Sequence, residues 1–155
     1  MACQGVDIRS ARQSDAETVT ALLMAQLSEH QIGTPADAVR KAVEGIIADH
    51  SRGFILVAAR GQTAVGVACV SFTWTLEHGG TSAWLDELFV VPEERNGGIG
   101  RAMLDAVLDQ ARAAGCAAVD LEVESSHARA EHLYARAGFT TLPRARRVRP
   151  FTPDE

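Results

Sequence analysis

The feature that most constrains this chain is the stretch over residues 85–104, in which a strand, a glycine-rich turn and a helix follow one another. Residues 85–91 are apolar and partly β-branched, and Pro92 ends the strand because proline has no N–H for the ladder. From Ile99 the apolar residues recur at helical spacing: Met103, Leu104, Val107, Leu108 and Ala111. Glycines between a strand and a helix let backbone N–H groups and the positive end of the helix dipole meet a phosphate. The sequence therefore predicts a phosphate-binding turn at residues 96–101.

Length and composition are typical of one globular domain, which we expect to span residues 1–155. Hydrophobic residues make up 46% of the chain and charged residues 23%, and no apolar run reaches the roughly 18 residues of a membrane span. The N-terminus lacks the basic and apolar pattern of a signal peptide. We therefore expect a cytoplasmic protein with no membrane partner.

Charge and metal-ligating residues argue against two classes of function. The formal net charge is −5, which disfavours nucleic acid as a partner and is compatible with a cationic substrate. The three cysteines, at positions 3, 69 and 116, are scattered, and the five histidines show no ligand spacing. We therefore expect reduced thiols and no metal site. Arginines cluster only over residues 144–149, where we favour a solvated edge strand over an anion site.

The rest of the chain predicts alternating strands and helices. The expected elements are a strand over 6–9, helices from 14 and from 35, strands over 54–59 and 65–74, the strand over 85–91, the helix from 99, a strand over 117–123, a helix over 128–137 and one or two strands over 139–148. Ser14 and Glu17 have the spacing of a capping box. Gly61 lies in the turn of an expected hairpin, Gly66 marks a bend in its second strand, and Gly138 ends the last helix.

These connections predict a mixed sheet. The helix between the strands at 85–91 and 117–123 makes that pair parallel, because only a crossover joins parallel neighbours. The short turns elsewhere imply antiparallel neighbours. The expected fold is a layered α/β (α+β) domain, whose mostly antiparallel sheet has helices on both faces.

Three kinds of glycine turn compete for residues 96–101. A Rossmann dinucleotide turn needs a third glycine where this chain has Met103, and it belongs after the first strand. A nucleoside-triphosphate P-loop needs a lysine in the turn, but Lys41 is the only lysine of the chain. The third kind has the pattern Arg/Gln-x-x-Gly-x-Gly/Ala, which the segment from Arg95 to Gly100 satisfies.

Two motifs together carry a family resemblance. The first is the segment from Arg95 to Gly100 after an apolar strand, and the second lies within residues 130–139, as Leu133-Tyr134 followed by Gly138-Phe139. Over residues 82–140 the sequence resembles the GNAT superfamily of acetyl-CoA-dependent N-acetyltransferases. The resemblance implies a sheet whose central parallel strands splay apart, and it implies acetyl-CoA as the cosubstrate.

The resemblance also implies which residues bind the cosubstrate. The backbone of Phe89, Val90 and Val91 would pair with the pantetheine arm like an added strand. The pyrophosphate would contact Arg95 and the N–H groups of the turn: Asn96, Gly97, Gly98, Ile99, Gly100 and Arg101. His127 stands where many family members have an asparagine that bonds the pantetheine. This histidine is either a replacement for that asparagine, an additional base or a solvated residue at a helix end.

Transfer of acetyl to an amine needs a base for the ammonium, N–H donors for the oxyanion and an acid for the thiolate. By resemblance Tyr134 is the acid, and strand N–H groups near Val90 serve the oxyanion; the alternative for Tyr134 is packing against the sheet. Asp86 and Glu87 resemble the acidic pair of spermidine/spermine-type acetyltransferases, and one of them, or water, is the base. Neighbouring strand residues point to opposite faces, so both acids reach a substrate only if a bulge intervenes. Glu122 is a third candidate.

The predicted function is N-acetylation of a primary amine on a small cationic substrate: a polyamine, an aminoglycoside or an amino acid derivative. Trp84 and Trp74 are candidate substrate-binding residues that could cage a cation, with packing against the helices as the alternative. The competing class is a non-catalytic acyl-CoA-binding sensor or regulatory module, in which the acids and Tyr134 serve structure. Since C-terminal strands often pair across subunits in the family, the resemblance also allows a homodimer.

Overall fold

The computed structural model describes residues 5–124 and 126–153. The chain divides at Glu122 into two compact units, residues 1–122 and 123–155, and each unit is described by itself. The expectation that residues 1–155 form one domain stays a prediction.

Within the described residues of the first unit, five strands form one sheet in the spatial order β1-β2-β3-β4-β5. Their bounds are Asp7–Ser10 for β1, Gly53–Arg60 for β2, Thr63–Thr75 for β3, Gly80–Val90 for β4 and Val119–Leu121 for β5. Neighbours from β1 to β4 are antiparallel, whereas β4 and β5 are parallel. The predicted mixed, mostly antiparallel sheet is confirmed.

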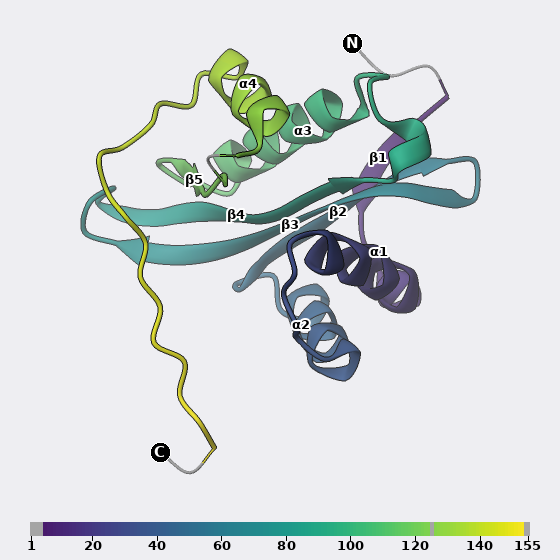
Figure 1. Ribbon diagram of the computed structural model, residues 1–155, viewed down its shortest axis with the longest axis horizontal. Coiled ribbons are helices and arrows are strands. Elements are labelled where there is room, and N and C mark those ends of the chain that lie inside the picture. The colour runs from purple at the N-terminus through teal and green to yellow at the C-terminus, as the bar shows by residue number, and fades with distance from the viewer. Residues whose placement is uncertain (1–4, 125, 154–155) are drawn as a thin grey trace. The chain divides into compact units, whose positions relative to one another are not determined.

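Helices cover both faces of this sheet (Figure 1). The helices α1 (Ala16–Glu29) and α2 (Ala36–Ala48) lie on one face, and α3 (Ile99–Ala113), which joins β4 to β5, lies on the other. Two short 3-10 helices, η1 (Gln13–Asp15) and η2 (Pro92–Glu94), precede α1 and follow β4. The second unit contains α4 (Ala128–Arg136). Within the described ranges, no helix has the length and apolar character needed to cross a membrane.

The core occupies both faces of β2 and β3. Residues 54–59 of β2 are all buried, as expected for a strand that is covered on both sides. On the α3 side the helix buries the residues that its spacing predicted, except Leu108: Ile99, Met103, Leu104, Val107 and Ala111. On the other side α1 and α2 bury four large aliphatic residues: Val19, Leu23, Val39 and Val43. Each such side chain stabilises the fold by roughly 1.5–3 kcal/mol.

Gly66 allows α3 to approach the sheet. A Cβ at this position would lie 2.8 Å from Met103 Sδ and 3.2 Å from the carbonyl oxygen of Phe89. The register with β2 shifts beside it, between Ala58 and Ala59. The predicted bend at Gly66 therefore corresponds to a β-bulge at a place where only a hydrogen side chain fits.

The predicted strands over residues 139–148 are wrong, because the described residues after α4 contain no strand. Pro143 and Pro150 remove ladder donors from this segment. Four arginines between them place like charges close together: Arg144, Arg146, Arg147 and Arg149. Both features oppose strand pairing.

The capping box predicted at Ser14 and Glu17 is also wrong. The helix α1 begins at Ala16 after a 3-10 turn, and its N-cap is Asp15, which makes no side-chain capping bond to the helix. A different network around Asp15 fixes this end of the helix.

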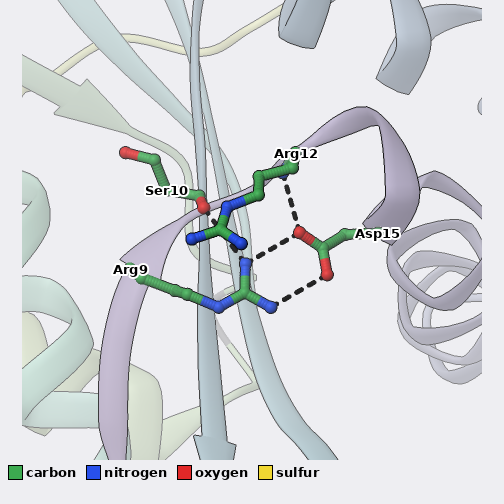
Figure 2. A network of polar contacts seen from close by, with 4 residues as sticks. All are labelled: Arg9, Ser10, Arg12 and Asp15. Atoms are coloured by element: carbon green, nitrogen blue, oxygen red, sulfur yellow. Dashed lines mark hydrogen bonds and ion pairs between the residues drawn. The ribbon is translucent and has the colours of Figure 1, made fainter.

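Figure 2 shows how this network joins the end of β1 to the start of α1. Arg9 donates two hydrogen bonds to the Asp15 carboxylate, at 2.7 and 2.9 Å, and the backbone N–H of Arg12 donates another at 2.7 Å. Arg9 also donates to the carbonyl oxygen of Ser10 at 3.2 Å. The bonds from Arg9 are the largest cause that lowers the pKa of Asp15 from its usual 3.8 to about 2, and burial opposes them.

We expect Asp15→Asn to remove stability that depends on pH. A carboxylate whose pKa is lowered by folding stabilises the protein above its unfolded pKa of 3.8, and this contribution is lost as the pH falls toward about 2. The variant should lose about 2 kcal/mol of unfolding free energy at neutral pH and much less in acid near the folded pKa. Urea unfolding of both proteins across this range measures the difference, and a difference independent of pH would contradict the role of Asp15.

Candidate active site

A β-bulge at Asp86 determines which side chains of β4 face α1 and α2. Glu87 pairs with Cys69 of β3 whereas Leu85 pairs with Val70, so Asp86 is an extra residue in β4. Regular alternation would place neighbours 86 and 87 on opposite faces. The extra residue resets the alternation, and both carboxylates line one cavity.

The cavity lies between α1, α2 and the strands β3 and β4, and its volume is about 240 Å³. Most of its lining side chains are aliphatic and come from the two helices, among them Leu23, Leu27, Val39, Val43 and Ile46. The strands add one thiol and the two carboxylates. Small-molecule sites usually combine apolar walls with a few polar groups in this way.

Glu87 is half-buried at this cavity, and its pKa is raised above the usual 4.5. Burial is the largest cause, and the negative charge of Asp86 acts in the same direction. A hydrogen bond with Gln26 and the charge of His30 oppose the shift. A carboxylate with a raised pKa accepts a proton more readily near neutral pH, which is what a general base must do.

Asp86 has a different environment from Glu87. Its side chain is exposed, and Ser71 Oγ donates a hydrogen bond to Asp86 Oδ2 at 3.2 Å. An exposed carboxylate attracts an ammonium group without first losing its own hydration. The two neighbouring acids therefore suit different tasks.

The buried thiol of Cys69 adds no charge to the cavity. Burial raises the pKa of Cys69 to about 12, and the charges of Asp86 and Glu87 act in the same direction. Cys69 and Cys116 are free thiols. In the part of the chain that the structure describes, no group of three or more His, Cys, Asp or Glu side chains is placed to hold a metal ion.

Asp120 and His78 form a pair that the sequence analysis missed. His78 Nε2 lies 2.8 Å from Asp120 Oδ2, and Asp120 pairs with Trp84 across the β4–β5 ladder. Trp84 also pairs with Ser71, so these side chains lie on the face of the sheet that carries Glu87.

A signal for Asp120 was present in the sequence, where acidic residues alternate at positions 120, 122 and 124. Of this series, Glu122 is the predicted candidate. In the structure Glu122 is exposed and follows the last residue of β5, whereas Asp120 lies within the strand. The partner His78 comes from a turn 42 residues away, and no local pattern connects the two.

The two tryptophans lie on opposite faces of the sheet. Trp84 pairs with Ser71, and Trp74 pairs with Thr81, an odd number of positions further along β3. Trp74 is 80% exposed, whereas Trp84 is half-buried. They do not form a cage together, and only Trp84 shares the face of the two acids.

The ladder between β4 and β5 ends early. It includes residues 83–85 of β4 and, in the described part of the first unit, none that follow. The N–H of Val91 donates to Val65 of β3 at 2.9 Å, so by alternation the backbone groups of Val90 point away from β3. The predicted splay of the parallel strands stays a prediction. Of the three residues predicted to pair with a pantetheine arm, Val90 is the one whose backbone N–H points away from β3.

Gly98 forms the turn between η2 and α3. Its φ of +87° lies in the left-handed region, as does the φ of +69° at Asn96. The N–H of Ala102 donates to the carbonyl of Gly98 at 3.0 Å as an intrahelical bond. The N–H groups ahead of it belong to the first turn, which lacks intrahelical acceptors: Ile99, Gly100 and Arg101. This geometry suits a phosphate.

Arg95 connects the glycine turn to α1. Its Nε donates to the carbonyl of Val90 at 2.8 Å, and its Nη2 donates to the Glu29 carboxylate at 2.9 and 3.2 Å. The guanidinium also lies 5.4 Å from the centre of the Phe89 ring. These contacts hold the end of α1 against the end of β4, and a contact between Arg95 and a pyrophosphate stays a prediction.

Tyr134 and His127 lie in the second unit. His127 is the N-cap of α4, and its N–H donates to the carbonyl of Glu124 at 2.9 Å. The Tyr134 ring meets the Phe139 ring edge to face, with centroids 5.7 Å apart, and Gly138 ends the helix region with a φ of +94°. The catalytic role of Tyr134 and the cosubstrate contact of His127 stay predictions.

Comparison with known proteins identifies the family. Residues 17–139 match the family described as Acetyltransferase (GNAT) family. This match covers most of the chain, so the protein belongs to the GNAT acetyltransferase family.

Individual relatives match shorter segments. Streptothricin acetyltransferase of Streptomyces lavendulae is 39% identical over 101 residues, which are 62% of this chain and 48% of that protein. Mycothiol acetyltransferase of Propionibacterium freudenreichii subsp. shermanii is 40% identical over 76 residues, 47% of this chain and 24% of that one. This chain thus spans half or less of these curated relatives. An aminoglycoside N-acetyltransferase solved in complex with CoA shares the fold, with a TM-score of 0.80, 22% identity and 94% coverage of both chains.

We expect Gly98→Ala to lower the free energy of unfolding by about 1–2 kcal/mol, because an alanine is strained in the left-handed region. Gly97→Ala is the matched control. A Cβ at Gly97 would meet only the carbonyl oxygen of Glu94 at 3.8 Å, so we expect a change within about 0.5 kcal/mol. Denaturant unfolding measures both, and equal effects would contradict the assigned backbone geometry.

We expect Glu87→Gln to stabilise the protein more as the pH rises. An acid whose pKa is raised by folding binds its proton more tightly in the folded state, so the wild type loses stability as the pH rises above the usual value of 4.5. The amide cannot ionise and escapes this loss. Thermal unfolding from acid to neutral pH measures the difference. Asp86→Asn should reduce the loss of stability that the wild type shows as the pH rises, because it removes a charge that raises the pKa of Glu87. If the difference in stability between Glu87→Gln and the wild type instead grew toward acid, burial would not penalise the ionised Glu87.

Proposed function

We propose that this protein is an acetyl-CoA-dependent N-acetyltransferase that acetylates the primary amine of a small cationic substrate by direct attack on the thioester. The observation that carries the proposal is the bulge at Asp86. It brings two carboxylates to one cavity, just beyond the residues of β4 that pair with β5. Membership of the GNAT family supports the identity of the acetyl donor.

The residues present fit coenzyme A as the carrier of that acetyl group. An extended arm would lie along the backbone of Phe89, Val90 and Val91, as an added strand does. The glycine turn and the first turn of α3 would hold the pyrophosphate through N–H groups of residues 96–101. Arg95 lies beside this turn.

The acids of β4 would bind and deprotonate the amine. Asp86 attracts the ammonium group electrostatically, and Glu87 takes the proton because burial has raised its pKa. Removal of this proton gives the nitrogen the free electron pair with which it attacks the thioester carbonyl. The N–H of Val90, which points away from β3, would stabilise the negative charge that develops on the oxygen of the thioester carbonyl.

Two further proton transfers complete the reaction. As the new C–N bond forms, the C–S bond breaks and its electron pair leaves with sulfur, while the nitrogen gives its second proton to solvent and becomes the neutral amide. Tyr134 would give its phenolic proton to this thiolate and recover one from solvent. His127 would orient the pantetheine arm in place of the family's asparagine.

The acceptor is proposed only as a class. The matched relatives are named for streptothricin, mycothiol and IAA, which are different compounds. A polyamine, an aminoglycoside and an amino acid derivative all satisfy the sequence evidence, with Trp84 beside the acids and with Trp74 and Glu122 as further candidates. A homodimer and a cytoplasmic location stay predictions.

The direct test is release of free thiol from acetyl-CoA in the presence of a panel of primary amines. We expect turnover, and we expect Glu87→Gln to lower kcat/KM by about 10²–10⁴-fold while the KM for acetyl-CoA changes little. Glu93→Gln is the matched control, since it removes an exposed carboxylate of η2 outside the cavity. Tyr134→Phe should lower kcat in the same range if the phenol is the acid.

Other outcomes identify what is wrong. Full activity of Tyr134→Phe would remove the acid assignment. A loss in Asp86→Asn but not in Glu87→Gln would exchange the roles of the two acids. Saturable binding of acetyl-CoA with no turnover on any amine would favour the non-catalytic acyl-CoA-binding sensor.

A further inference from the structure

The composition of the cavity restricts the acceptor more closely than the sequence does. The helices contribute side chains without charge, including Leu23 and Leu27 of α1 and Val43 of α2. Leu23 and Val43 are 5% and 2% exposed, so they form a continuous wall with the core. The charged groups among the lining residues are the two neighbouring carboxylates of β4.

A ligand that fits this cavity has its positive charge at one end. Hydroxyl or ammonium groups placed along the aliphatic wall would lose hydrogen bonds to water and gain none in return. The thiol of Cys69 supplies no counter-charge, because it is buried and neutral. Thr34 is the remaining polar residue of the lining.

The size of the cavity points in the same direction. Its 240 Å³ lies below the roughly 300–1,000 Å³ of sites for drug-sized ligands. Ala38 and Ala42, one helical turn apart on α2, keep this space open with their small side chains.

A second ammonium group finds no carboxylate further along the cavity. Asp120, another acid on this face of the sheet, is 2.8 Å from His78 Nε2 and is not part of the lining. A polycation would therefore leave its additional charges against hydrocarbon.

We propose that the acceptor is a small monoamine with a compact apolar body, which the cavity holds between α1 and α2 while its single ammonium group meets Asp86 and Glu87. The inference rests on the proposed N-acetyltransferase function and selects among its acceptor classes. It selects against aminoglycosides and polyamines, because their additional hydroxyl or ammonium groups would lie against hydrocarbon.

A matched pair of amines tests the charge. Hexylamine and hexane-1,6-diamine have the same length and differ by one terminal ammonium group. With acetyl-CoA saturating, we expect kcat/KM for hexylamine to exceed that for the diamine at least 10-fold. From propylamine to hexylamine each methylene should raise kcat/KM about three- to four-fold, and decylamine should fall below hexylamine because the cavity is filled.

A matched pair of variants tests whether the amine binds in this cavity. Ala42→Phe fills the mouth of the cavity at an exposed position of α2, so the core is undisturbed. We expect it to lower kcat/KM for hexylamine at least 10-fold with no change in the KM for acetyl-CoA. Ala48→Phe makes the same change at an exposed position of the same helix outside the cavity, and it should act like the wild type. Ala42→Glu should shift preference toward the diamine, since it adds a carboxylate where the second charge would lie.

The outcomes separate this inference from the proposed function. Turnover that is equal or faster with the diamine, or equal effects of Ala42→Phe and Ala48→Phe, would overturn the inference and leave the acetyltransferase intact. If no amine is acetylated, the proposed function fails, and calorimetric titration of the CoA-bound protein with the two amines still decides the inference. Tighter binding of hexylamine, lost in Ala42→Phe, supports it, whereas tighter or equal binding of the diamine overturns it.

Discussion

One extra residue in β4 governs the chemistry that this fold can perform. The bulge at Asp86 resets the alternation of the strand, so that two consecutive acids face the same side of the sheet. The ladder with β5 ends one residue earlier, at Leu85, and in the described part of the first unit it includes no later residue of β4. A regular strand would have placed one of the two acids on the α3 side of the sheet. The side-chain half and the backbone half of the proposed site thus adjoin one another in β4.

The two acids show how a difference in burial gives chemically similar carboxylates different properties. Glu87 is half-buried beside Gln26 and His30, and burial raises its pKa. Asp86 is exposed and accepts a hydrogen bond from Ser71. In the proposed mechanism one acid exchanges a proton and the other attracts the ammonium group, although the two are adjacent in the chain. The aliphatic surroundings that perturb Glu87 are the same surroundings that would select the body of the acceptor.

Local patterns in the sequence were sufficient for the mixed sheet, for the helix α3 and for the turn that precedes it. The spacing after Ile99 gave the buried face of α3, and the glycines gave a left-handed turn at Gly98, because both signals are local. The sequence analysis could state only that both acids reach a substrate if β4 contains a bulge. The bulge itself could not be predicted, because an extra residue in one strand is recognised only when its pairing with the partner strand is known. The Asp120–His78 pair could not be predicted without the register between β4 and β5. The prediction of strands over residues 139–148 did not take account of the prolines and the like charges in that segment. The predicted start of α1 is wrong because Arg9 of the preceding strand bonds the Asp15 carboxylate, and this contact fixes the start of the helix in place of the local capping pattern.

The two halves of the site differ in what they are made of, and this difference affects how such a protein can evolve. The region suited to coenzyme A consists mainly of backbone groups of β4 and of the first turn of α3, which most substitutions leave in place. The cavity wall consists of side chains on α1 and α2, where an exchange such as Ala42 for a larger or charged residue changes its shape without touching the glycine turn. Single substitutions on α1 or α2 would therefore change the proposed acceptor site and leave the proposed acetyl-CoA site unaltered.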